Sequence, residues 1–155
     1  MYVSSYRLND TLKCSLYLLF LITKLNIMSK QIIKTDKAPA PIGPYNQAIK
    51  TNDFLFISGQ VAINPATNEI VTNSIVNETH QVMKNIEAIL KEANIGFQHV
   101  VKTTIFLSDM NLFADINTVY AHYFEGDFPA RETIAVKGLP KNANVEISMT
   151  AVVHL

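Results

Sequence analysis

Hydrophobic and polar positions form several short runs that are typical of β-strands. Residues 53–63 (DFLFISGQVAI) are mostly apolar at consecutive positions, which indicates a strand covered on both faces, and Gly59 marks a bulge or a close backbone approach within it. Residues 99–109 are rich in β-branched side chains, which favour strands. The strands predicted in this way are residues 31–35, 53–63, 99–109, 132–138 and 145–153.

Two other segments repeat apolar residues at helical spacing. The first stripe consists of Val82, Ile86, Ile89, Leu90 and Ala93. The second stripe consists of Phe113, Ile116, Val119, Tyr120 and Phe124. Residues 94–96 predict a left-handed end for the first helix, and Asn111 is expected to cap the second. The order β-β-α-β-α-β-β predicts an α+β fold, in which a single sheet carries two helices packed on one face.

The sheet face away from the helices is expected to be apolar as well. Phe54 and Phe56 alternate with Leu55 and Ile57, so this segment places large apolar side chains on both sides of one strand. A second apolar face on one small domain predicts a partner surface, and closed self-association is the commonest way to cover such a face. We therefore expect a homo-oligomer.

Composition narrows the classes of function. The chain has 155 residues, enough for one domain with a core, and its formal net charge is zero, with 13 basic and 13 acidic residues. No stripe of Lys or Arg is present, so we expect no nucleic-acid partner and no membrane partner. The only cysteine is Cys14, which excludes an internal disulfide, and the four histidines show no ligand spacing, so no metal is expected.

Residues 1–27 differ from the rest of the chain. Residues 14–22 (CSLYLLFLI) are apolar but shorter than the roughly 18 residues of a membrane-spanning helix. Two interpretations remain open for this extension, namely a dispensable or mis-assigned start and a targeting segment. Asp10 and the lack of a small-residue cleavage site weigh against the second interpretation. We expect the functional domain to occupy residues 28–155.

Arg131 is the only arginine from Met28 onward. It follows Pro129, which restrains the preceding backbone, and it begins an apolar strand-like run. A rigidly placed guanidinium suits a bidentate grip on a carboxylate or a phosphate. The alternative is an ion pair with Glu132 or Glu146, although Glu132 is adjacent in sequence and points to the other face of a strand.

Three further polar residues are candidates for a site. Glu146 lies in the apolar run of the last predicted strand, and such surroundings raise the pKa of a carboxyl group and suit it to hold a water and shuttle its proton. A rim carboxylate without a function is the alternative interpretation. Tyr45 and Ser58 lie beside glycines, where the backbone can come close to a ligand. No nucleophile elbow, P-loop or zinc-protease motif is present, which limits the chemistry to an already reactive substrate.

Four segments together carry a family resemblance. They are APIGPYNQA, FLFISGQV, VVKTTIFLSDMNLFADINTVYAHYF and FPARETIAVKGLPKNANVEIS. From Met28 to Leu155 the chain resembles the RidA/YjgF family of small trimeric enamine and imine deaminases. The resemblance implies a chorismate-mutase-like fold, a homotrimer with a central barrel, active sites between subunits and a cytoplasmic location.

The resemblance also assigns roles to individual residues. It implies catalytic roles for Arg131, Glu146 and Tyr45, with Arg131 binding the substrate carboxylate and Glu146 positioning water. It implies substrate-binding roles for Ser58, Gly59, Asn117 and Thr133, with Asn117 reaching the site from a neighbouring subunit. Two positions depart from the family pattern: Glu132 stands where a small residue is common, and Thr133 where cysteine is common.

The implied reaction is hydrolysis of 2-aminoacrylate/2-iminopropanoate and 2-iminobutanoate to 2-oxo acids and ammonia, without a cofactor. The implied partners are small 2-imino and 2-oxo carboxylates. Two alternatives remain open. Some relatives are described as ribonucleases or translation inhibitors, and the same arginine would serve a non-catalytic trimer that senses a small carboxylate.

Overall fold

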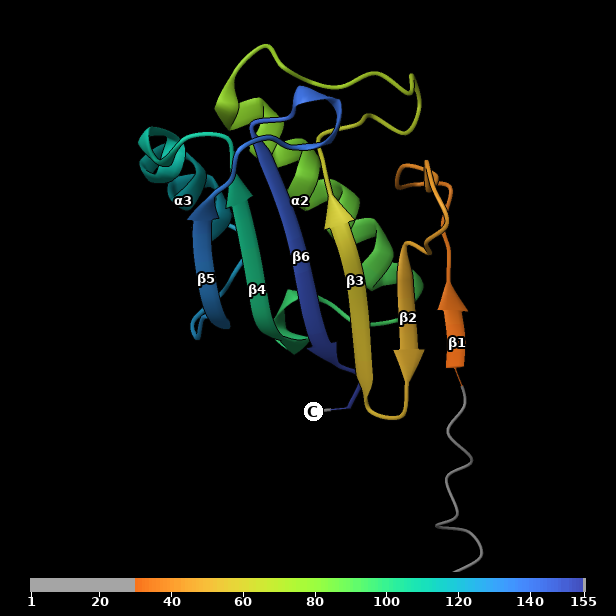
Figure 1. Cartoon of the computed structure of the whole chain (residues 1–155). Coiled ribbons are helices and arrows are strands. Elements are labelled where there is room, and N and C mark those ends of the chain that lie inside the picture. Colours follow the sequence, from red (N-terminus) through yellow and green to blue (C-terminus); the bar gives the residue numbers. More distant parts are fainter. Residues whose placement is uncertain (1–29, 155) are drawn as a thin grey trace, which may run out of the picture.

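The structure is a computed structural model that describes residues 30–154, so the predicted extension over residues 1–27 lies outside the described residues. One mixed six-stranded sheet carries two α-helices on one face (Figure 1). The strands are β1 (Lys30–Ile33), β2 (Ala48–Thr51), β3 (Phe54–Gln60), β4 (Val100–Leu107), β5 (Ala130–Ala135) and β6 (Val145–Val152). The helices are α2 (Ile75–Glu92) and α3 (Phe113–Ala121), and the 3₁₀ turns are η1 (Phe97–His99), η2 (Met110–Leu112) and η3 (Pro140–Asn142).

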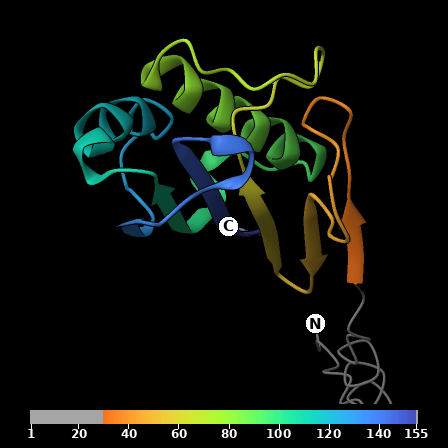
Figure 2. The same ribbon diagram turned by 45° about the horizontal axis from the view of Figure 1, so that its top comes forward.

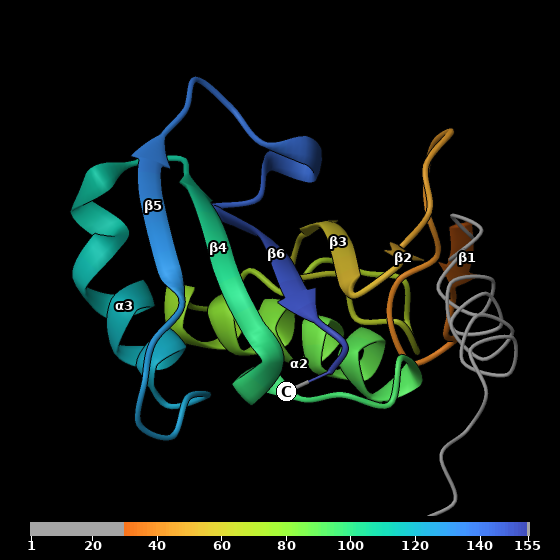
Figure 3. The ribbon, with the colours of Figure 1, turned by 90° about the horizontal axis from the view of Figure 1, so that it is seen from below.

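The sheet has the order β1-β2-β3-β6-β4-β5. All neighbours pair antiparallel except β4 and β5, which are parallel and joined through α3. Figures 2 and 3 show α2 and α3 on the same side of this sheet. The fold class predicted from the sequence, a single sheet with two helices on one face, is confirmed.

One strand was not predicted. β2 pairs antiparallel with β3, and the two strands form a hairpin whose turn contains Asn52 with a positive φ of 50°. β2 has four residues, AIKT, directly after the proline-rich loop. A run this short shows no clear period of two, so pairing with β3 rather than local pattern determines its conformation.

Helix α2 has well-defined ends. The Ser74 hydroxyl accepts a hydrogen bond from the Asn77 N–H (3.1 Å), which satisfies a donor that the first turn leaves free. At the other end Asn94 adopts φ 60°, and the N–H groups of Asn94 and Ile95 donate to the carbonyls of Lys91 and Leu90. The predicted left-handed helix end is confirmed, with Asn94 as the left-handed residue.

The predicted cap of the second helix is wrong. Asp109, not Asn111, is the capping residue, and its carboxylate accepts the Asn111 N–H at 2.8 Å. This cap belongs to the 3₁₀ turn η2, and α3 continues from η2 at Phe113. Because this turn precedes the helix, the cap lies two residues before the predicted position.

The two faces of the sheet have different surroundings. On β6, Val145, Ile147, Met149 and Ala151 are buried against the helices, and the alternate residues point to the other side, here called the open face. Register continues the open face across the sheet through Ile32, Phe54, Phe56, Thr104, Phe106, Glu132 and Ile134. Ile32, Phe54, Phe56 and Ile134 are exposed, so the expected second apolar face is present. Within residues 30–154, no helix is both long and apolar enough to cross a membrane.

Candidate active site

Arg131 and Glu146 lie on opposite faces of the sheet. On β5 Arg131 is opposite Thr103 of β4, which is fully buried on the helix side. Glu146 on β6 is opposite Phe106 of the same β4 strand. Thr103 and Phe106 are three positions apart, so they point to different faces, and their partners do the same. One protomer therefore holds the predicted site as two separate halves.

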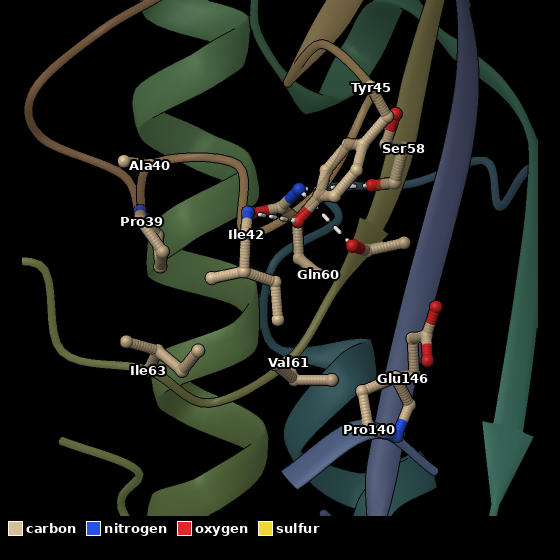
Figure 4. Close-up of a pocket in the computed structure, with 11 residues that line it drawn as sticks. Pro39, Ala40, Ile42, Tyr45, Ser58, Gln60, Val61, Ile63, Pro140 and Glu146 are labelled. Atoms are coloured by element: carbon tan, nitrogen blue, oxygen red, sulfur yellow. Dashed lines mark hydrogen bonds between the residues drawn. The ribbon is translucent and has the colours of Figure 1, made fainter. Parts of the chain in front are cut away.

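The first half is a cavity of about 430 Å³, called here the carboxylate cavity (Figure 4). Its lining residues are Pro39, Ala40, Ile42, Tyr45, Ser58, Gly59, Gln60, Val61, Ile63, Pro140 and Glu146. Four predicted site residues thus lie together, although they come from the β1–β2 loop, β3 and β6. Most of the other lining residues are apolar, so the cavity suits a small ligand with a hydrocarbon part.

Gly59 and Glu146 are in direct contact. The β3–β6 register shifts between Ile57 and Gln60, which confirms the predicted bulge. A Cβ atom at position 59 would overlap the Glu146 carboxylate, so only glycine lets the carboxylate lie against the backbone there. Burial raises the pKa of Glu146 above its ordinary value, as expected from its apolar neighbours.

Tyr45 and Ser58 differ in what they offer a ligand. The Tyr45 phenol oxygen accepts the Ile42 N–H (3.4 Å), and its own O–H is left to donate. The Ser58 hydroxyl donates to the Asn46 carbonyl (2.7 Å), so its proton is already used. Ser58 therefore presents only an acceptor to the cavity, and it also ties β3 to the residue next to Tyr45.

The second half, called here the arginine hollow, lies between α3 and β5. It is lined by Asn117, Tyr120, Ala121, Phe128, Pro129 and Arg131. The guanidinium carbon of Arg131 lies 4.9 Å from the ring centroid of Tyr120 and 5.8 Å from that of Phe113. Such cation–π contacts hold a guanidinium plane in place while its N–H groups keep their donor capacity.

Tyr120 is itself fixed. Its hydroxyl donates to Thr103 Oγ1 (3.1 Å), and burial raises the pKa of this phenol, so the ring under Arg131 stays neutral. Because the Tyr120 ring is buried and its hydroxyl is hydrogen-bonded, the ring holds a fixed position beneath the Arg131 guanidinium.

The alternative prediction, an ion pair between Arg131 and a glutamate, is wrong for the described residues. Glu132 forms an ion pair with Lys102 and accepts a hydrogen bond from the Thr104 hydroxyl (2.6 Å). Both contacts lower the pKa of Glu132, and the contact with Lys102 has the larger effect. Glu146 lies on the opposite face of the sheet. Within residues 30–154, Arg131 has no acidic partner.

Asn117 and Thr133 belong with Arg131. Asn117 lines the arginine hollow of the same protomer. Thr133 lies two residues beyond Arg131 on the same face of β5, and its hydroxyl oxygen is buried without a hydrogen-bond partner in the part of the chain that the structure describes. Because Asn117 and Arg131 line the same hollow, a neighbouring subunit that brings Asn117 to the carboxylate cavity must also bring Arg131.

Sequence reasoning missed the aromatic surroundings of Arg131 and the walls of the carboxylate cavity. The helical pattern places Phe113 and Tyr120 in the core stripe of the second helix. Their seven-residue spacing is the signal in the sequence that both face one side chain. Between residues 30 and 154, no three His, Cys, Asp or Glu side chains lie close enough together to hold a metal ion.

Comparisons with known proteins identify the family and agree with the fold. The sequence model of a family described as "Endoribonuclease L-PSP" matches residues 35–153. A RutC family protein of Pyrococcus horikoshii is 50% identical over 122 residues, covering 79% of this chain and 97% of that protein. The 2-iminobutanoate/2-iminopropanoate deaminase of Mus musculus is 45% identical over 123 residues, covering 79% and 91%. The crystal structure of E. coli TdcF with bound serine has a TM-score of 0.76 at 35% identity, covering 79% and 98%.

Proposed function

Since this chain belongs to the RidA/YjgF family, we propose that it hydrolyses 2-aminoacrylate/2-iminopropanoate and 2-iminobutanoate to 2-oxo acids and ammonia. Its family membership and the deaminase name of the mouse relative support this reaction class. One observation carries the proposal: Arg131 and Glu146 lie in two hollows on opposite faces of the sheet. The Arg131 guanidinium has no acidic partner in residues 30–154, and the Glu146 carboxylate is half-buried and has a raised pKa.

The reaction requires the two halves to meet. Because one protomer holds them on opposite faces, the arginine hollow of one subunit faces the carboxylate cavity of the next. A closed ring of three subunits repeats this contact three times and covers the apolar open faces. The homotrimer is thus part of the proposal, and so is a site made by two chains.

The roles of the residues follow from their chemistry. Arg131 binds the substrate carboxylate with two parallel N–H···O bonds and fixes the imine carbon near Glu146. Glu146 takes a proton from water as the oxygen bonds to the imine carbon. The C=N electron pair moves to nitrogen, and Glu146 gives the proton to that nitrogen. The hydroxyl of the resulting carbinolamine then passes its proton through Glu146 to the nitrogen as the C=O bond forms and the C–N bond breaks, and ammonia and the 2-oxo acid leave. Tyr45 donates to the substrate, and Ser58 accepts.

The family description also names an endoribonuclease, which is the competing function. A zero net charge and a single arginine after Met28 disfavour a grip on RNA phosphates. Salt-sensitive RNA binding by the purified protein would favour the competing function.

The test is hydrolysis of 2-aminoacrylate generated in the cuvette by a serine dehydratase, followed as pyruvate release. We expect acceleration by the parent protein and a loss of about 10²-fold or more with Arg131→Ala, since two charge-assisted hydrogen bonds are worth about 1.5–3 kcal/mol each. Arg131→Lys should lie between the two, because it keeps the charge without the bidentate geometry. Lys91→Ala, which removes a charge from the exposed face of α2, is the matched control and should match the parent. An Arg131→Ala variant as fast as the parent would refute the assignment of Arg131.

A further inference from the structure

Hydrogen bonds from buried polar side chains hold the walls of the carboxylate cavity in place, and the proposed mechanism does not use these side chains. Gln47, Glu78 and Asn85 are 2%, 0% and 1% exposed, respectively. Each donates to or accepts from the backbone of a different segment at the cavity. Buried polar side chains are costly unless their hydrogen bonds are made, so three of them around one cavity call for an explanation.

Gln47 fastens the proline-rich loop. Its amide oxygen accepts the Thr35 N–H (2.8 Å), and its amide nitrogen donates to the carbonyls of Thr35 (2.9 Å), Ala38 (3.1 Å) and Pro39 (2.8 Å). This loop supplies the wall that contains Tyr45 and Ile42 (Figure 4). Its three prolines have no N–H group, which leaves the loop with fewer backbone hydrogen bonds of its own.

Asn85 fastens the opposite wall. From the buried side of α2, its amide nitrogen donates to the carbonyls of Val61 (3.1 Å) and Ile63 (2.9 Å), and its oxygen accepts from Gln81 (2.8 Å). Val61 and Ile63 both line the cavity. They follow the end of β3, where only an isolated bridge between Ile63 and Ile70 continues the pairing.

Glu78 fastens the third wall. Its two carboxylate oxygens accept the backbone N–H (2.6 Å) and the side-chain amide (2.9 Å) of Asn144. Asn144 lies between Pro140 and Glu146, both of which line the cavity. The Asn144 side-chain oxygen also accepts the Ser108 hydroxyl (2.9 Å), which joins α2, the end of β4 and the start of β6.

We propose that Gln47, Asn85 and Glu78 are positioning residues that hold the three walls of the carboxylate cavity in the shape that binds substrate. The role of the cavity in substrate binding rests on the proposed function. Since the three side chains bond only to protein, their loss leaves every reacting group in place but lowers the fraction of molecules with a formed cavity. A ligand that binds only the formed cavity then shows an apparent affinity reduced by that fraction.

The test uses variants of similar shape: Gln47→Met, Asn85→Leu and Glu78→Gln. Thr79→Val is the matched control, because Thr79 is equally buried in α2 and its hydroxyl bonds only to the Ile75 carbonyl (2.8 Å), away from the cavity. Steady-state hydrolysis of 2-iminobutanoate is measured below the melting range of every variant. For each of the three we expect KM to rise about tenfold with kcat within about twofold of the parent, because saturating substrate selects the formed cavity. Thr79→Val should lower the melting temperature and leave KM unchanged.

Amide hydrogen exchange supplies a readout that does not depend on turnover. We expect faster exchange confined to residues 36–46 in Gln47→Met, to 61–64 in Asn85→Leu and to 140–146 in Glu78→Gln. Unchanged exchange in these segments, or an equal KM rise in Thr79→Val, would overturn the proposal, as would loosened walls with an unchanged KM. An inactive parent protein whose variants show the confined exchange would refute the proposed function and leave the fastening of the walls supported.

Discussion

Glu146 holds its charge at a cost that depends on pH. Its surroundings are half-buried and apolar, and burial raises its pKa above the ordinary value of 4.5. A group whose pKa is higher in the folded than in the unfolded protein favours folding while protonated. That contribution is complete below the unfolded pKa and is lost as the pH rises through the folded pKa. At neutral pH the charged Glu146 carboxylate therefore lowers the free energy of unfolding relative to a neutral side chain at this position.

Glu146→Gln should consequently be more stable than the parent at pH 7. The difference in melting temperature should shrink as the pH falls through the raised pKa of folded Glu146, and it should be absent below about 4.5, where both side chains are neutral. The same variant should lose imine hydrolysis, because an amide takes no proton from water. Glu132→Gln is the control of opposite sign: Lys102 and Thr104 lower the pKa of Glu132, so its small stabilisation is present at neutral pH and is lost on acidification. A Glu146→Gln melting temperature below that of the parent at pH 7 would contradict the account of the cavity.

At the scale of elements, the bulge in β3 places the carboxylate. The register shift between Ile57 and Gln60 brings the Gly59 backbone against Glu146, so that the side chain of Glu146 on β6 packs against the backbone of β3. The position of the Glu146 carboxylate thus depends on two strands and on the lack of a side chain at residue 59.

Gly59→Ala should displace the carboxylate, because the added methyl group would occupy its place. We expect kcat/KM to fall about 10²-fold, the size of effect that a displacement near 1 Å produces. Gly43→Ala is the matched control, since a Cβ there meets only the Tyr45 ring at 3.7 Å, an ordinary contact. Circular dichroism melting of both variants would show whether the fold is kept. Full activity in Gly59→Ala would contradict the proposed position of Glu146.

Most elements could be predicted from the sequence, because their signals are local. The apolar period of α2, the β-branched residues of β4 and the glycine in β3 each act within a few residues. Local pattern also indicated the raised pKa of Glu146. β2 was missed because its four residues are defined by pairing with β3.

The division of the site could not be predicted in the same way. Alternation shows which residues of one strand share a face, but the relation between Arg131 and Glu146 depends on the register of β5 and β6 against β4, which joins segments far apart in sequence. The role of Gln47 was hidden for the same reason, since its partners lie eight to twelve residues away in an irregular loop.

At the scale of the whole molecule, the proposed assembly depends on the open face. Ile32, Phe54, Phe56 and Ile134 are exposed on one side of the sheet, while the helices cover the other side (Figure 1). Apolar area removed from water contributes roughly 25 cal/mol per Å², so contact between open faces would supply a large part of the association free energy.

Phe56→Glu should therefore prevent assembly, because it places a charge in the centre of the surface to be covered. We expect a monomer by analytical ultracentrifugation and, because the proposed site needs two chains, loss of imine hydrolysis. Val76→Glu is the matched control, since Val76 is exposed to a similar extent on α2 (41% against 47% for Phe56) and lies on the other side of the sheet. Its variant should keep both assembly and activity. An active Phe56→Glu monomer would refute the two-chain site.

The most direct measurement is imine hydrolysis by mixed oligomers of Arg131→Ala and Glu146→Gln. Each variant alone should be nearly inactive, since every one of its sites lacks one half. If the two variants are unfolded together in equal amounts and refolded, the proposed trimers should assemble at random. Each mixed trimer should then contain one site with both native halves. The account predicts recovery of about one quarter of the parent rate, from three quarters of the trimers with one intact site in three. A mixture no more active than its components, beside an active parent, would show that Arg131 and Glu146 do not act together across a subunit boundary.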